Sequence, residues 1–322
     1  MRVWRPRAGR WGLILIVMLA FAAEASAQIK QERKLPQLAG YNLLPAMTVP
    51  DPFITTYIRS ATGFGVALDI TIPVYDRDGN VVDTLDGDLA FLLLGFEYQQ
   101  ALTRWLSLRL GVEGLARVGV NAESVLAQGI SAVRAFDLGA TIRLWHNRNA
   151  ILSLVGSVRN SRLIGVDIIG FVQKVIKDDG IADKSDLLRK QSALSYSGGV
   201  RFGLGLGKGF GLTLLAEGGS AESIAVEGGR EGTYTFAGTV SFDINAVMPL
   251  PVGLLFGYTQ SNFPVSGDDI AKSVRTWVAK VAYTGREEFS VGAEFNFFQA
   301  PLVRSPDTLE AASAFLTLRY FF

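Results

Sequence analysis

The sequence has no cysteine, a single histidine and a formal net charge of only +1. Without cysteine there is no disulfide scaffold, no thiolate metal site and no lipid-anchored cysteine after a signal peptide. The small net charge argues against a nucleic-acid partner, because such proteins usually carry a clear basic excess. No group of histidine, aspartate and glutamate residues has the spacing of metal ligands. The composition therefore predicts neither a metal site nor a cofactor.

The few features that resemble catalytic or nucleotide-binding motifs have simpler explanations. His146 lies in a tight turn, His146–Asn149, and we expect a solvated turn residue there rather than a general base. The glycines of Gly203–Gly207 stand in an alternating strand pattern, where glycine relieves crowding on the inner wall and allows bending. We therefore expect no catalytic residue and no enzymatic activity.

Only one long apolar run is present, and it lies at the start of the chain. Trp11–Ala23 follows a basic segment and precedes the small residues Ala25–Ala27. This order predicts a secretory signal peptide over residues 1–27, cleaved before Gln28. The run is too short for a membrane helix, which needs about 20 apolar residues. We expect the mature chain to be exported without a helical anchor.

Residues 28–62 lack a regular pattern and contain four prolines. Proline removes backbone donors, so this region does not form sheet interior. Two interpretations remain open, a periplasmic tail or a segment folded into a barrel as a plug. Apolar residues favour the plug, namely Leu43, Leu44, Met47, Phe53 and Ile54. Residues 54–59 either extend a first strand or lie outside the barrel.

From residue 63 to residue 322, segments of alternating apolar and polar residues are separated by turn residues. In the last segment, Ala311–Phe322, every second residue from Leu316 onward is apolar. A period of two places the apolar and polar sets on opposite faces of a strand. Counting such segments predicts about twelve strands.

The connections between these segments alternate in length. Tight connections are expected at residues 102–105, 146–149, 207–209, 248–251 and 285–288. Longer ones are expected near residues 75–87, 121–131, 160–192, 219–231, 260–274 and 300–311. This alternation is typical of outer-membrane barrels, which have short periplasmic turns and long extracellular loops. An even number of strands leaves both termini in the periplasm.

One long connection, residues 166–190, has apolar residues at helical spacing followed by charged ones. It forms either an external helix packed on the barrel mouth or a loop that folds inward and narrows the pore.

The chain ends on the aromatic residue Phe322, after the alternating positions described above. This ending resembles the targeting signal of Gram-negative outer-membrane β-barrels. The resemblance implies an all-β, antiparallel, up-and-down transmembrane barrel in that membrane. It also implies contact with outer-membrane lipid and with the barrel-assembly machinery through the C-terminal strand. Twelve-stranded members include nucleoside and acidic-sugar channels, autotransporter translocators and a phospholipase, and none matches this chain residue by residue.

Charged residues on the inward faces are the candidates for lining the lumen. They are Asp69, Glu97, Arg109, Glu113, Asp137, Arg143, Arg201, Glu217, Asp243, Lys280, Glu294 and Arg319. Counting outward from the tight turns predicts the pairs Glu97–Arg109, Arg201–Glu217 and Lys280–Glu294, and barrel closure predicts Asp69–Arg319. The signs are mixed, so we expect no strong ion selectivity.

Three functions are compatible with this pattern. The first is a passive channel or small-solute transporter with a narrow, mixed-charge lumen. The second is a non-conducting, plugged barrel with a structural or interaction role. The third is a transporter of hydrophobic solutes with an opening through its wall. The fold alone does not separate them.

Overall fold

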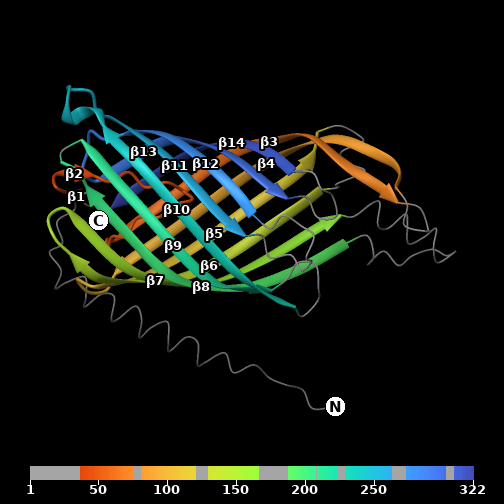
Figure 1. Cartoon of the computed structure of the whole chain (residues 1–322), viewed down its shortest axis with the longest axis horizontal. Coiled ribbons are helices and arrows are strands. Elements are labelled where there is room, and N and C mark those ends of the chain that lie inside the picture. Colours follow the sequence, from red (N-terminus) through yellow and green to blue (C-terminus); the bar gives the residue numbers. More distant parts are fainter. Residues whose placement is uncertain are drawn as a thin grey trace, which may run out of the picture.

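Twelve antiparallel strands form one closed barrel, in which each strand pairs with the next and the last pairs with the first (Figure 1). The computed structural model describes residues 37–75, 81–120, 130–166, 188–207, 209–222, 229–262, 273–301 and 308–322. The strands are β3 (Tyr57–Tyr75), β4 (Val81–Ala101), β5 (Leu106–Gly119), β6 (Ile130–His146), β7 (Ala150–Val166), β8 (Leu188–Gly205), β9 (Phe210–Glu222), β10 (Arg230–Asp243), β11 (Val252–Asn262), β12 (Ser273–Tyr283), β13 (Phe289–Pro301) and β14 (Thr308–Phe321). The predicted fold class and strand number are confirmed.

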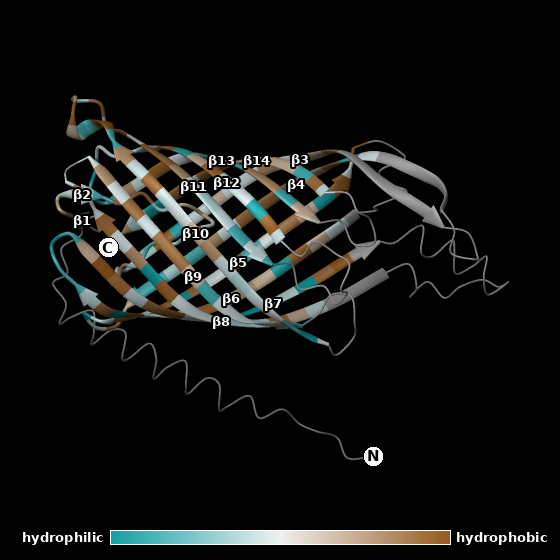
Figure 2. Cartoon of the chain, in the orientation of Figure 1, coloured by the Kyte–Doolittle hydropathy of each residue, from teal (hydrophilic) through white to brown (hydrophobic). Residues whose placement is uncertain are grey.

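The outer face of the barrel is apolar, and the inner face carries most of the polar side chains. In β14, Leu316 and Leu318 are exposed, whereas the intervening Thr317 is buried. The same alternation runs around the wall, so that brown and teal residues alternate along the strands in Figure 2. Phe64, Phe136 and Phe256 are each more than half exposed. A belt of this kind is unfavourable in water and matches the lipid-facing surface of a membrane barrel.

Strands β3 and β14 close the barrel. Tyr57 pairs with Phe321, and Arg59 pairs with Arg319. Residues 57–59 therefore belong to the first strand, which begins before the predicted start at residue 63. The prediction that Asp69 and Arg319 are neighbours is wrong, because Arg319 pairs with Arg59. Arg59 lies toward the other end of β3 from Asp69. The alternation at the start of β3 is hard to recognise because its outward positions there include Ser60 and Thr62.

Short connections join the strands at one end of the barrel, here named the turn end. They occupy residues 102–105, 147–149, 206–209, 244–251 and 284–288. Four of them lie close to the predicted positions, whereas the fourth begins before the predicted residue 248 and contains the 3-10 helix η2 (Ile244–Ala246). The chain terminus after β14 and the short strands β1 (Gln37–Leu38) and β2 (Tyr41–Asn42) also lie at this end (Figure 1).

At the opposite end the strands run further than the sequence predicts. β4 begins at Val81, inside the predicted loop 75–87. β7 continues to Val166 and β8 starts at Leu188, inside the predicted loop 160–192. Backbone pairing persists where lipid no longer requires apolar residues on the outer face, so the sequence period fades before the ladder does. Residues 167–187, which carry most of the predicted helical pattern, lie outside the described residues. Among the described residues, no helix is long and apolar enough to cross a membrane.

Residues 37–56, here named the inner segment, pack against the inward face of the wall at the turn end. The hairpin β1–β2 is anchored by a hydrogen bond from the Ala39 N–H to the Arg148 carbonyl (2.6 Å). A Cβ at Gly205 would lie 2.2 Å from the Leu38 carbonyl oxygen, and one at Gly211 would lie 2.3 Å from the Tyr41 ring. Glycine at these two wall positions is therefore required by the segment's close approach, as the prediction of relieved crowding implied.

The inner segment is held by two buried apolar clusters. Leu44, Ala46 and Val49 form a buried cluster with wall residues of β9 to β12, namely Leu215, Ala237, Leu255, Val278 and Ala282. A second cluster joins Leu38, Tyr41, Leu43 and Phe53 to Ile151 of β7. Burial raises the pKa of the Tyr41 phenol above its ordinary value, because the charged phenolate would be poorly solvated there. Residues 28–36, the rest of the region with two interpretations, lie outside the described residues.

Candidate functional site

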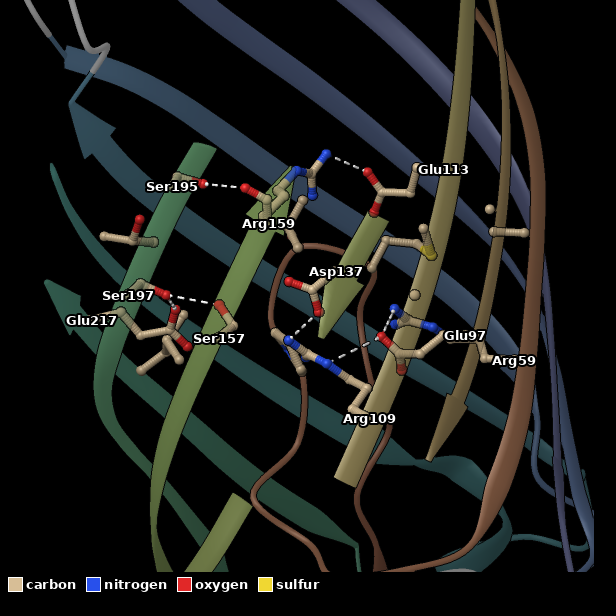
Figure 3. Close-up of a pocket in the computed structure, with 18 of the residues that line it drawn as sticks. Arg59, Glu97, Arg109, Glu113, Asp137, Ser157, Arg159, Ser195, Ser197 and Glu217 are labelled. Carbon is tan, nitrogen blue, oxygen red and sulfur yellow. Dashed lines mark hydrogen bonds and ion pairs between the residues drawn. The ribbon is translucent and has the colours of Figure 1, made fainter. Parts of the chain in front are cut away.

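A cavity of about 340 Å³ lies in the barrel interior beside the inner segment. Its wall is formed mainly by inward side chains of β3 to β9, and Met47, Thr48 and Pro50 of the inner segment complete it. Figure 3 shows the charged and hydroxyl side chains of these strands facing one another across this space. The charged lining residues are Arg59, Glu97, Arg109, Glu113, Asp137, Arg159, Arg201 and Glu217.

An ion-pair chain crosses four neighbouring strands on one side of the cavity. The Glu97 carboxylate accepts hydrogen bonds from Arg59 Nη2 (2.9 Å) and the Tyr57 hydroxyl (2.5 Å). Arg109 Nε lies 3.9 Å from Glu97 Oε2, and Arg109 Nη2 donates to Asp137 Oδ1 (2.8 Å). Each charge in the chain thus faces an opposite charge on an adjacent strand.

Two further pairs and three serines complete the cavity wall. Arg201 Nη2 donates to Glu217 Oε1 (3.0 Å), and Arg159 Nη2 donates to Glu113 Oε2 (2.6 Å). The first pair is nearly buried, whereas the Arg159 and Glu113 side chains are 42% and 39% exposed. The hydroxyls of Ser157 and Ser197 are 3.0 Å apart, and Ser197 also reaches Glu217 at 3.4 Å, while Ser195 donates to the Arg159 carbonyl.

Three buried polar atoms of cavity-lining residues have no hydrogen-bond partner among the residues that the structure describes. They are the Nε atoms of Arg109 and Arg201 and the Thr48 hydroxyl. Arg201 is only 5% exposed. Buried donors without partners are costly, by about 1–3 kcal/mol each, so a lining that leaves such groups beside a cavity is suited to donate hydrogen bonds to a ligand or to solvent.

A second set of charged side chains lies beyond the cavity and holds the inner segment. Lys280 Nζ donates to the Pro45 carbonyl (2.8 Å), and both Glu294 carboxylate oxygens accept from the Met47 N–H, at 3.0 and 3.1 Å. Lys280 and Glu294 face each other at 3.7 Å. Both side chains are shielded, since those of Lys280 and Glu294 are 4% and 0% exposed.

An ion pair between Asp51 and Arg319 also anchors the inner segment. The guanidinium of Arg319 binds the Asp51 carboxylate and lies 3.6 Å from the centre of the Tyr57 ring. The other Asp51 oxygen accepts the Phe53 N–H at 3.0 Å. Both side chains of the pair are 4% exposed. We refer to Lys280–Glu294 and Asp51–Arg319 together as the latch.

The twelve candidate lining residues thus fall into distinct places. Six line the cavity, namely Glu97, Arg109, Glu113, Asp137, Arg201 and Glu217. Lys280, Glu294 and Arg319 belong to the latch, and Asp243 accepts a hydrogen bond from the Thr284 hydroxyl (2.9 Å) at a turn. Arg143 is half-buried beside a register shift in β6, and the Asp69 side chain lies outside the described residues.

Several cavity residues were missed in the sequence. Arg59 lies before the predicted start of the barrel, and Arg159 lies in a stretch where leucines blur the two faces. The alternation of Ser153, Ser157 and Arg159 along β7 is a signal that identifies this face. The predicted pairs Arg201–Glu217 and Lys280–Glu294 are present, and Glu97–Arg109 is present at a longer distance. Among the described residues, no group of three or more His, Cys, Asp or Glu side chains is placed to hold a metal ion.

Comparison with known proteins shows which solved structures share this fold. No family model and no curated protein matches the chain. An outer-membrane channel from Pseudomonas putida F1 has a TM-score of 0.53 at 12% identity, over 87% of this chain and all of that one (100%). A Pseudomonas aeruginosa FadL homologue has a TM-score of 0.50 at 11% identity, over 88% and 96% of the two chains. At these identities the similarity shows the fold, which is that of Gram-negative outer-membrane β-barrels.

Proposed function

We propose that this barrel is an outer-membrane channel or transporter for small solutes, with the charged cavity as part of the solute path. In the proposed orientation the turn end, both termini and the inner segment face the periplasm, and the longer connections face outward. The observation that carries the proposal is the cavity itself. A polar space of about 340 Å³ inside an apolar-coated barrel serves passage or binding, since a purely structural core gains nothing from it.

The charge distribution supports the same function. Burying unpaired charges in a dry core costs several kcal/mol each, so structural interiors avoid them. Even paired charges lose hydration when they are buried, and here four arginines and four carboxylates line one cavity, with the Arg159–Glu113 pair substantially exposed. A lumen that water and solutes enter accounts for this arrangement.

A non-conducting barrel is the second candidate function. It is favoured by the inner segment, which is fixed by two buried apolar clusters and by the latch. A barrel closed in this way would serve to anchor its external connections. In the channel proposal, the same contacts make the inner segment a restriction that sets the rate of passage. A hydrophobic-solute transporter is less well supported, because the cavity lining is rich in charges and hydroxyls.

Planar-bilayer recordings test the choice between these functions. We expect the purified barrel to give small, discrete conductance steps with weak preference for cations or anions, and a variant lacking residues 37–50 to give larger ones. Heat-modifiable migration in gels is the control for a folded barrel. If both proteins remain folded and electrically silent, the channel proposal fails and the anchoring role leads.

We further propose that the C-terminal strand engages the barrel-assembly machinery. Phe322 is 40% exposed and its ring lies 6.4 Å from that of Tyr98, centre to centre, at the turn end. Replacing Phe322 by aspartate is expected to lower the amount of membrane-inserted protein several-fold, measured by fractionation and heat-modifiability. Replacement by tyrosine is the matched control. Equal insertion of both variants would contradict the role.

A further inference from the structure

The chemistry of the cavity lining points to a class of solute. We infer that the cavity binds a small, uncharged, polyhydroxylated solute of the sugar or polyol class. This inference rests on the proposed function and names the substrate class of the same site. It depends on three features: the charge balance of the lining, the pairing of its charges, and the donors that remain unpaired.

The charges of the lining sum to zero. Four arginines and four carboxylates line the cavity, namely Arg59, Arg109, Arg159, Arg201, Glu97, Glu113, Asp137 and Glu217. A solute with a net charge therefore gains little Coulomb attraction on entering, although it loses hydration. The balance selects against simple anions and cations and leaves uncharged solutes and zwitterions.

The pairing of these charges separates the two remaining classes. Asp137 and Glu217 already hold an arginine at 2.8 and 3.0 Å, and Glu97 holds Arg59 at 2.9 Å. A zwitterion would have to replace these pairs with its own charged groups, which leaves a wall charge without its partner in a shielded site. An uncharged solute binds without breaking any of them.

The remaining hydrogen-bonding capacity matches hydroxyl groups. Among the described residues, Nε of Arg201 and the Thr48 hydroxyl have no hydrogen-bond partner, and Nε of Arg109 has only the Glu97 carboxylate at 3.9 Å. A solute hydroxyl accepts from a guanidinium and at the same time donates to a carboxylate, whose oxygens have further lone pairs. Ser157, Ser195, Ser197 and Thr235 add hydroxyls around the same space. The cavity of about 340 Å³ lies near the lower end of the roughly 300–1,000 Å³ typical of ligand pockets.

Two variants change the net charge of the lining at a pair that is partly exposed. The Arg159–Glu113 pair is about two-fifths exposed, so the loss of either charge is compatible with folding. Glu113→Gln makes the lining net positive, and Arg159→Gln makes it net negative. In proteoliposomes we expect wild-type protein to pass glucose at least threefold faster than glucuronate or glucosamine. Glu113→Gln should shift this ratio toward glucuronate, and Arg159→Gln toward glucosamine.

Binding is measured separately from passage. In detergent, titration of the full chain with glucose and with glycine by saturation-transfer NMR should show binding of the sugar and little of the zwitterion. Thr48→Val and Ser197→Ala should each weaken sugar binding at least threefold, whereas Thr62→Val on the outer face should not.

The outcomes distinguish a failure of the proposed substrate class from a failure of the proposed channel function. Passage without preference for the uncharged sugar, together with sugar affinity that is unchanged in Thr48→Val and Ser197→Ala, overturns the substrate class but leaves the channel. Sugar binding by a folded barrel that passes no solute supports the site and contradicts the channel.

Discussion

The two sides of the barrel interior differ although the same twelve strands form them. On the side of β9 to β12, inward residues such as Leu215, Leu255 and Val278 are apolar and packed against the inner segment. On the side of β3 to β8, Glu97 and Arg109 belong to an ion-pair chain beside the cavity. The difference shows that residues 44–49 of the inner segment are seated by hydrophobic contact against β9 to β12, whereas the cavity beside them is lined mainly by polar residues of β3 to β8.

The largest effect is expected from placing a charge in the apolar side. Leu44 is 5% exposed in the cluster that contains Leu255, and a carboxylate buried there without a partner is strongly unfavourable. Leu44→Asp should therefore expel the inner segment, which raises both its cleavage by protease and the conductance of the barrel. Thr48→Asp, in the same segment but lining the charged side, is the matched control. Equal cleavage of the two variants would show that the two sides do not differ in this way.

A second, smaller effect is expected at the latch. Arg319→Met removes the partner of the buried Asp51 carboxylate, and breaking such a pair costs about 3–5 kcal/mol. Urea titration of the folded barrel measures this loss. Arg159→Met, from a pair on the charged side that is about two-fifths exposed, should cost no more than about 1 kcal/mol. A double variant, Asp51→Asn with Arg319→Met, should recover part of the stability, and its failure to do so would argue against the pair as the cause.

The smallest of the three effects is expected when arginine is placed on the outer face and, for comparison, in the cavity lining. Val240 is 55% exposed on the apolar outer belt, and arginine there should destabilise the barrel by about 2–4 kcal/mol in lipid. Thr235→Arg, earlier on the same strand but lining the cavity, should cost less. Thr239 is unsuitable as the inner control because it is only 3% exposed. Similar losses for both variants would mean that the cavity is closed to water.

The sequence was most informative where the environment restricts every second residue. The lipid-facing positions of β14 are apolar without exception from Leu316 onward, so the strand and its faces could be predicted. Tight turns fix the register of hairpins, which is why Arg201–Glu217 and Lys280–Glu294 could be paired by counting. Arg59 escaped prediction because its outward neighbours Ser60 and Thr62 are polar.

Contacts of the inner segment could not be predicted in the same way. Asp51 and Arg319 are 268 positions apart and are not joined by any ladder. An irregular segment has no period and no register, so its partners follow only from the shape of the finished interior. For the same reason the sequence indicated inward charges but did not separate those that face the cavity from those that hold the segment.

The Asp51–Arg319 pair of the latch lies at the closing seam, and this position has a consequence for biogenesis. Tyr57 and Phe321 pair where the first strand meets the last, and Arg319 lies on this seam while it binds Asp51. The residues that join the seam are the most distant in the chain, so we expect them to meet late in folding. The inner segment must therefore already be inside when the seam closes. Entry of the inner segment and closure of the wall then occur in the same folding step. A barrel that closes early would leave the inner segment outside its lumen.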